Sequence, residues 1–181
     1  MIQKAVATIA DLYRVEKKAE LVNGEIVIMS PASAGHNRVA MRIGRSLLEY
    51  EERTGKGCAF TDNAGFVVDL PNRQSFSPDA AYFFGPFNED EFIDGAPAFA
   101  AEVRSPEDFG PAAERAMAQK RADYFAAGTQ VVWDVDMIRE KVIRVYRAAA
   151  PDQPTIYRPG DLAEAESALP GWTMPVADLL R

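Results

Sequence analysis

The segment AFAAEVRSPED, residues 98–108, most constrains the fold, because it is typical of a buried strand yet carries two charges. Side chains alternate between the two faces of a strand, so Glu102 and Arg104 point to one face, opposite Phe99, Ala101 and Val103. A buried glutamate is costly unless it is paired or bound to a metal. The strand then ends at Ser105-Pro106, and the charged face needs an explanation.

Local signals predict the elements before this strand. An Asn-Gly dipeptide suited to a type I′ turn predicts a hairpin over 19–29. Ser33 as N-cap and Gly55 as closing residue predict a helix over 34–53. Its apolar stripe at helical spacing comprises Val39, Ala40, Ile43, Leu47 and Tyr50.

The remaining elements complete an α/β pattern. A helix over 112–127 follows Pro111 and ends at Gly128. The turn-rich PNRQSFSP lies between two expected strands, at about 58–69 and 79–84. Pro-rich turns and an apolar segment, PVADLL, follow the expected strand at 141–148. The further strands are expected at about 58–69, 79–84, 131–136 and 141–148. This order predicts one α/β domain over 1–181, with a central mixed sheet flanked by helices.

The composition is that of a soluble cytoplasmic protein, with 48% hydrophobic and 26% charged residues. No apolar run approaches the roughly 18 residues of a membrane span, and the charged N-terminal segment is unlike a secretory signal. The single cysteine, Cys58, excludes a disulfide framework and a multi-cysteine zinc site. Because the net charge is −7, any face that binds nucleic acid must be local.

Three side chains could converge on one site. Asp79 opens an apolar strand, where its carboxylate could face a cleft or merely end a turn. Lys120 lies on the inward stripe of the 112–127 helix and needs an acceptor, which Glu102 could supply. An ion pair between Glu102 and Arg104 is the structural alternative. The inward stripe comprises Ala113, Met117, Lys120 and Tyr124.

Asp, Glu and Lys from two strands and a helix suit phosphodiester hydrolysis. Two carboxylates hold Mg²⁺ through hard oxygen ligands. The metal polarises the phosphoryl oxygen and lowers the pKa of a bound water. A lysine orients that water or neutralises charge in the transition state.

Short motifs with a fixed order extend this pattern along the chain. They are ELVNGEIVIMSPAS followed by His36, Pro78-Asp79, Glu102-Val103-Arg104-Ser105-Pro106, Lys120-Arg121-Ala122-Asp123-Tyr124, Gly128 before VVWDVD, and Leu169-Pro170-Gly171-Trp172. Together they resemble the PD-(D/E)xK nuclease superfamily, and more closely its Uma-type family of restriction-endonuclease-like proteins, from about Tyr13 to Leu180.

The resemblance implies a restriction-endonuclease-like core and assigns roles to its residues. Asp79 and Glu102 would be metal ligands, with the backbone carbonyl of Val103 as another. Lys120 matches a lysine that the family places on the following helix, and Arg104 occupies the more usual lysine position. Arginine stays protonated, so Arg104 cannot be a base, but it could bind phosphate or hold Glu102.

Two further residues are candidates for supporting roles. Glu20, at the start of the hairpin, is favoured over Glu25, because the superfamily often adds an acidic residue from its N-terminal region. His36 faces inward near the helix start and is either a structural group or part of the site. Trp133 and Tyr124 are expected in the core and not as stacking platforms for bases.

These residues predict a cytoplasmic DNA endonuclease dependent on Mg²⁺ or Mn²⁺, working as a homodimer by analogy with the superfamily. Two alternatives stay open. One is a non-catalytic binding or oligomerisation module, in which Glu102, Arg104 and Lys120 form an ionic network without metal. The other is a metal-dependent hydrolase of a different phosphate ester.

Overall fold

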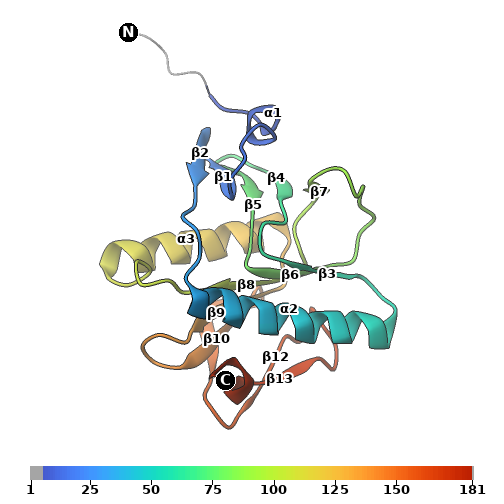
Figure 1. Ribbon diagram of the computed structural model, residues 1–181, viewed down its shortest axis with the longest axis vertical. Helices are drawn as coiled ribbons and strands as arrows, with labels where there is room; N and C mark the ends of the chain where they lie inside the picture. The colour runs from blue at the N-terminus through green and yellow to red at the C-terminus, as the bar shows by residue number, and fades with distance from the viewer. Residues whose placement is uncertain (1–5, 181) are drawn as a thin grey trace.

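A six-stranded mixed sheet forms the centre of the computed structural model, which describes residues 6–180 (Figure 1). In sheet order its strands are β11 (Ala150–Tyr157), β10 (Val142–Arg147), β9 (Val131–Asp136), β8 (Phe99–Val103), β6 (Ala80–Phe83) and β3 (Cys58–Thr61). Only β8 and β9 are parallel neighbours in this sheet. Helix α3 (Pro111–Ala127) makes the crossover that a parallel pair requires.

A second sheet of five strands lies beside the first. Its order is β2 (Glu25–Ile28), β1 (Ala19–Val22), β5 (Arg73–Phe76), β4 (Phe66–Leu70) and β7 (Ile93–Asp94). The remaining elements are α1 (Ile9–Leu12), α2 (Ala34–Thr54), the β12–β13 pair (Leu162–Glu164, Thr173–Pro175) and the short 3-10 helix η1 (Val176–Leu180). The expected mixed sheet flanked by helices is confirmed, with this second sheet added.

The alternation of side chains along the central strands creates two apolar cores. Phe99, Ala101 and Val103 of β8 face the core that contains α2, whereas Ala100 faces the core shared with the second sheet and α3. In Figure 1, α3 and the second sheet lie on one side of the central sheet and α2 lies on the other. Glu102 shares its face with Ala100 and therefore points toward α3.

The C-terminal segment fastens α2 to the central sheet. The Trp172 ring stacks on Trp133 of β9, with centroids 4.8 Å apart, and its indole N–H donates to Ser46 Oγ of α2 at 3.1 Å. Arg42 of α2 also donates to the carbonyl of Leu179 in η1 at 3.1 Å. The middle of α2 is thus held by the segment that contains Trp172 and η1.

Both long helices begin and end where their cap residues predict. Ser33 Oγ accepts a hydrogen bond from His36 N, and Gly55 ends α2 with φ of 63°, a left-handed conformation that glycine adopts without strain. Pro111 is the first residue of α3, and Gly128 ends it in the left-handed region. These signals are local, so the sequence alone reveals them.

Three strand predictions were wrong. The expected strand over 58–69 is two strands, β3 and β4, separated by a turn in which Asn63 has a left-handed φ of 72°. The segment PNRQSFSP contains β5. Its Arg73 is buried, and the guanidinium forms ion pairs with residues of distant elements. The Pro-rich tail contains β11, which tolerates prolines because it is an edge strand.

Candidate active site

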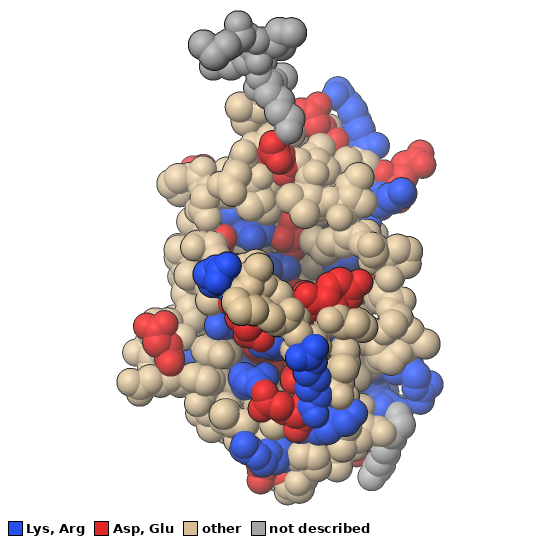
Figure 2. All heavy atoms as spheres, turned by 90° about the vertical axis from the view of Figure 1, so that its left-hand side faces the viewer, with Lys and Arg blue, Asp and Glu red and all other residues tan. Residues whose placement is uncertain are grey.

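A pocket of about 1000 Å³ opens on one side of the molecule. One wall is the connection between β2 and α2, and the other is residues 105–108 with the first turns of α3. Figure 2 shows this face, where acidic and basic side chains intermingle around and inside a hollow. Asp79, Glu102 and Lys120, predicted to converge, all line this pocket.

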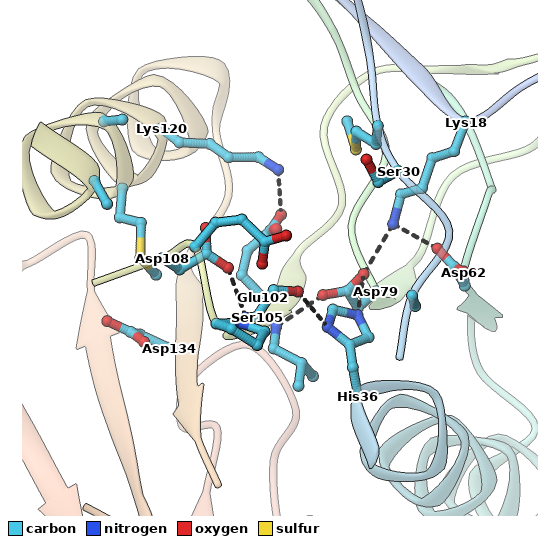
Figure 3. Close-up of a pocket in the computed structure, with 18 of the residues that line it drawn as sticks. Lys18, Ser30, His36, Asp62, Asp79, Glu102, Ser105, Asp108, Lys120 and Asp134 are labelled. Atoms are coloured by element: carbon cyan, nitrogen blue, oxygen red, sulfur yellow. Dashed lines mark hydrogen bonds and ion pairs between the residues drawn. The ribbon is translucent and has the colours of Figure 1, made fainter. Parts of the chain in front are cut away.

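Asp79 is held at the mouth of β6 through both carboxylate oxygens (Figure 3). Its Oδ2 accepts a hydrogen bond from Val103 N at 2.8 Å. Its Oδ1 lies 2.8 Å from Lys18 Nζ and 3.2 Å from His36 Nε2. Burial alone would raise the pKa of Asp79, but His36 and Lys18 lower it well below its usual range. Asp79 is therefore an anion at neutral pH.

His36 and Lys18 each link Asp79 to a second residue. His36 lies in the first turn of α2, and its Nδ1 is 3.1 Å from Ser105 Oγ. The bond to Asp79 outweighs burial and raises the pKa of His36. The Lys18 ammonium also pairs with Asp62, in the turn between β3 and β4.

Glu102 and Lys120 form the second half of the site. Lys120 Nζ, from α3, lies 2.8 Å from Glu102 Oε1, and the Tyr124 hydroxyl donates to the same oxygen at 2.6 Å. Burial disfavours the Lys120 ammonium, but Glu102 and Glu20 more than offset this and raise its pKa. Burial, together with the charges of Asp79 and Glu20, raises the pKa of Glu102 despite Lys120.

Glu20 connects this half of the site to the second sheet. It is buried on β1, and its Oε1 lies 2.9 Å from Lys120 Nζ and accepts from Ser77 N at 2.9 Å. Its Oε2 accepts from Arg73 at 2.6 Å. The alternative residue, Glu25, is exposed on β2. The structure thus places Glu20, and not Glu25, beside Lys120.

Arg104 belongs to a different network from Glu102, which corrects the proposed Glu102–Arg104 ion pair. Its guanidinium donates twice to Asp134 of β9, both at 2.7 Å, and also pairs with Glu114 of α3. A planar guanidinium matches a carboxylate in this two-bond geometry. Lys120 instead reaches Glu102, so the expected set of three charges divides into two clusters.

The donor set fits a hard divalent cation. Within residues 6–180, no three His, Cys, Asp or Glu side chains are grouped closely enough to hold a metal by themselves. Mg²⁺, however, is usually bound by one or two carboxylates together with water and substrate phosphate. The carboxylates of the ion-pair network also exceed its bases. The carboxylates are Glu20, Asp62, Asp79, Glu102 and Asp123; the bases are Lys18, Arg73, Lys120 and His36.

Sequence reasoning missed several polar groups of the pocket, among them Lys18, Asp62 and Ser105. Lys18 could have been found, because it lies two residues before Glu20 in an extended segment and so points to the same side. Asp62 was missed because one continuous strand was predicted over 58–69, which leaves no turn at this residue. Ser105 was placed at the end of a strand and within a motif, without a role in the pocket. The predicted core positions of Tyr124 and Trp133 are confirmed, since both side chains are fully buried.

Comparison with solved structures defines the class of fold. The chain matches a crystal structure from Anabaena variabilis entitled "putative nuclease belonging to DUF820", with a TM-score of 0.74 and 19% sequence identity. The match covers 95% of this chain and 96% of that one. The fold is therefore restriction-endonuclease-like.

The family follows from the sequence itself. Residues 7–177 match the Uma2 family, whose description is "Putative restriction endonuclease". The chain belongs to this family, which confirms the resemblance drawn from its motifs. A comparison with curated proteins gave no match. Across residues 6–180, no helix is both long and apolar enough to cross a membrane.

Proposed function

We propose that this chain is a metal-dependent DNA endonuclease that hydrolyses phosphodiester bonds in the pocket. The observation that carries the proposal is the convergence of Asp79, Glu102 and Lys120 from β6, β8 and α3 in one open pocket. Membership of a family described as restriction endonucleases supports DNA as the substrate.

Asp79 and Glu102 would hold Mg²⁺ or Mn²⁺, with the backbone carbonyl of Val103 as a further ligand. A bound ion of this kind polarises the phosphoryl oxygen and makes its bound water more acidic. The negative excess of the surrounding network favours the binding of a divalent cation.

Side chains of the protein itself supply positive charge and orient the two carboxylates. Lys120 is held as an ammonium, because Glu102 and Glu20 raise its pKa although burial opposes this. It neutralises charge that develops on the phosphate or positions the attacking water. The Tyr124 hydroxyl orients Glu102, and His36 orients Asp79. Arg104 supports the end of β8 through Asp134.

Cleavage of plasmid DNA with Mg²⁺ or Mn²⁺ tests this proposal. Asp79→Asn, Glu102→Gln and Lys120→Met should each lower the rate by about 100-fold or more, in line with the loss of preorganised charge at an active site. Glu49→Gln, which breaks an exposed ion pair on α2, is the matched control and should cleave normally. Circular dichroism establishes that each variant is folded. Full activity of both carboxylate variants would disprove the site.

Two further measurements separate the alternatives. Hydrolysis of a small phosphodiester without cleavage of DNA would favour a hydrolase of another phosphate ester. Calorimetry that detects no Mn²⁺ binding would favour a non-catalytic module. The proposal includes a homodimer, which light scattering tests directly.

A further inference from the structure

Both oxygens of the Asp79 carboxylate already have partners. Its Oδ2 is bound to the backbone N–H of Val103 at 2.8 Å, within the central sheet. Its Oδ1 contacts both Lys18 and His36. Oδ2 keeps a second lone pair, but a cation that binds Oδ1 competes with both of these partners, and one of them must withdraw to make room.

Lys18 is the partner that can withdraw. His36 is fixed in the first turn of α2, and its other ring nitrogen contacts Ser105 Oγ. Lys18 instead lies before the first residue of β1 and carries a flexible stem with three donors. Its ammonium already pairs with Asp62 as well as Asp79, so it can leave Asp79 without losing every acceptor.

We propose that Lys18 takes the place of the divalent ion at Asp79 Oδ1 and moves toward Asp62 when the ion binds. This role rests on the proposed function, since it requires a metal site at Asp79 and Glu102. The ammonium offsets the repulsion between the two carboxylates while no metal is bound. Consistently, both Asp79 and Glu102 raise the pKa of Lys18, although its burial opposes this.

If Lys18 competes with the metal ion, Lys18→Met and Asp62→Asn should change the affinity for Mn²⁺ in opposite directions. Lys18→Met removes the competing cation, so Mn²⁺ should bind more tightly, by about fivefold or more, the usual lower range of coupling between two ligands. Asp62→Asn replaces the alternative anion by a neutral amide, which holds the Lys18 ammonium less strongly and leaves it at Asp79, so Mn²⁺ should bind more weakly by a similar factor. Asp62 is half-exposed, and this second variant keeps the test usable if Lys18→Met unfolds.

Lys17→Met is the matched control. Lys17 lines the same pocket and carries the same charge, but its side chain is exposed. If Lys18 acts through direct contact, Lys17→Met should change Mn²⁺ affinity by less than about twofold, as expected for a screened surface charge. Titration calorimetry of the full chain measures all four proteins without using catalysis.

The outcomes distinguish this role from the proposed function. Wild-type protein that binds Mn²⁺ no more weakly than Lys18→Met would overturn the role of Lys18 and leave the metal site standing. An equal change in Lys17→Met would overturn it as well, by showing an effect of charge alone. Absence of Mn²⁺ binding in every variant would overturn the metal site and this role together.

Discussion

His36 joins α2 to both sides of the pocket through its two ring nitrogens. Nε2 faces Asp79, and Nδ1 faces Ser105 at the end of β8. An imidazolium can donate at both positions, whereas a neutral imidazole donates at one only. The carboxylate of Asp79 therefore favours the protonated form and raises the pKa of His36 in the folded state.

This shift gives the stability of the protein a pH dependence. Because the folded-state pKa lies above the unfolded value of about 6.5, the contribution of His36 is complete below that value and disappears as pH rises through the folded pKa. The free energy of unfolding should therefore fall more for the wild type than for His36→Gln between about pH 6 and about pH 9. Urea denaturation measures both; parallel pH profiles would contradict this prediction.

Arg104 gives a second prediction for a single residue. Asp134 is 1% exposed, and Arg104→Gln would remove both of its close charge-assisted hydrogen bonds, leaving the Arg121 guanidinium 3.7 Å away. Breaking a buried ion pair on one side costs about 3–5 kcal/mol of unfolding free energy. Arg45→Gln, which removes an exposed pair with Glu49, should leave stability unchanged. Chemical denaturation compares Arg104→Gln with Arg45→Gln. Similar midpoints for the two variants would contradict a buried structural role for Arg104.

At the scale of elements, α2 approaches β3 closely at Gly44. A methyl group added there would lie 2.3 Å from Thr61 Cγ2, whereas one added at Gly35 would meet no atom within 4 Å. Gly44→Ala should destabilise the protein by about 1–3 kcal/mol through overpacking. Gly35→Ala should stabilise it by about 0.4–1 kcal/mol by restricting the unfolded chain.

A double variant tests whether the contact with Thr61 is the cause. Thr61→Ala removes the methyl group that the added carbon would meet, so it should restore most of the stability lost in Gly44→Ala. Thermal unfolding of the single and double variants gives the coupling between the two positions. Additive losses would show that the helix is constrained by some other contact.

The elements that the sequence predicts are those with local signals. Helices α2 and α3 carry their own caps, and the Asn-Gly turn defines the β1–β2 hairpin. Strand β5 has no such signal, because Arg73 is buried only through Glu20 and Asp123, which are 53 and 50 residues away.

The same division applies to the candidate site. The alternation of side chains along β8 and the inward stripe of α3 were sufficient to bring Glu102 and Lys120 together. The contacts of Lys18 could not be predicted from its neighbours, because Asp62 and Asp79 are 44 and 61 residues away. Arg104 was assigned the wrong partner for the same reason, since Asp134 lies on the next strand of the sheet.

At the scale of the whole molecule, the charge balance limits attraction to DNA. Basic residues do line the pocket, but most of them already pair with carboxylates of this protein. These are Lys18, Arg73, Lys120 and Arg121, whereas Lys17 is an exposed lysine at the rim. Under the proposed function, few counterions should therefore be released when the protein binds DNA.

Binding to DNA should accordingly depend only weakly on salt. We expect the logarithm of the association constant to fall with the logarithm of salt concentration with a slope no steeper than about −2. Lys17→Met should reduce that slope by about 1. Fluorescence anisotropy of a labelled duplex without metal measures both, and a slope steeper than about −5 would reveal an extended basic face.

The contacts of Trp172 and η1 with α2 bear on the order in which parts of the chain are available to fold during synthesis. The side chains of the candidate site lie between Lys18 and Asp134, whereas Trp172 and η1, which hold α2 against the sheet, are made afterwards. A nascent chain thus carries every reactive group of the site before the segment with Trp172 and η1 is made. The contact between Ser46 and Trp172 joins positions separated by 126 residues. The contacts that hold α2 from this segment therefore form only after the residues of η1 have been added to the chain.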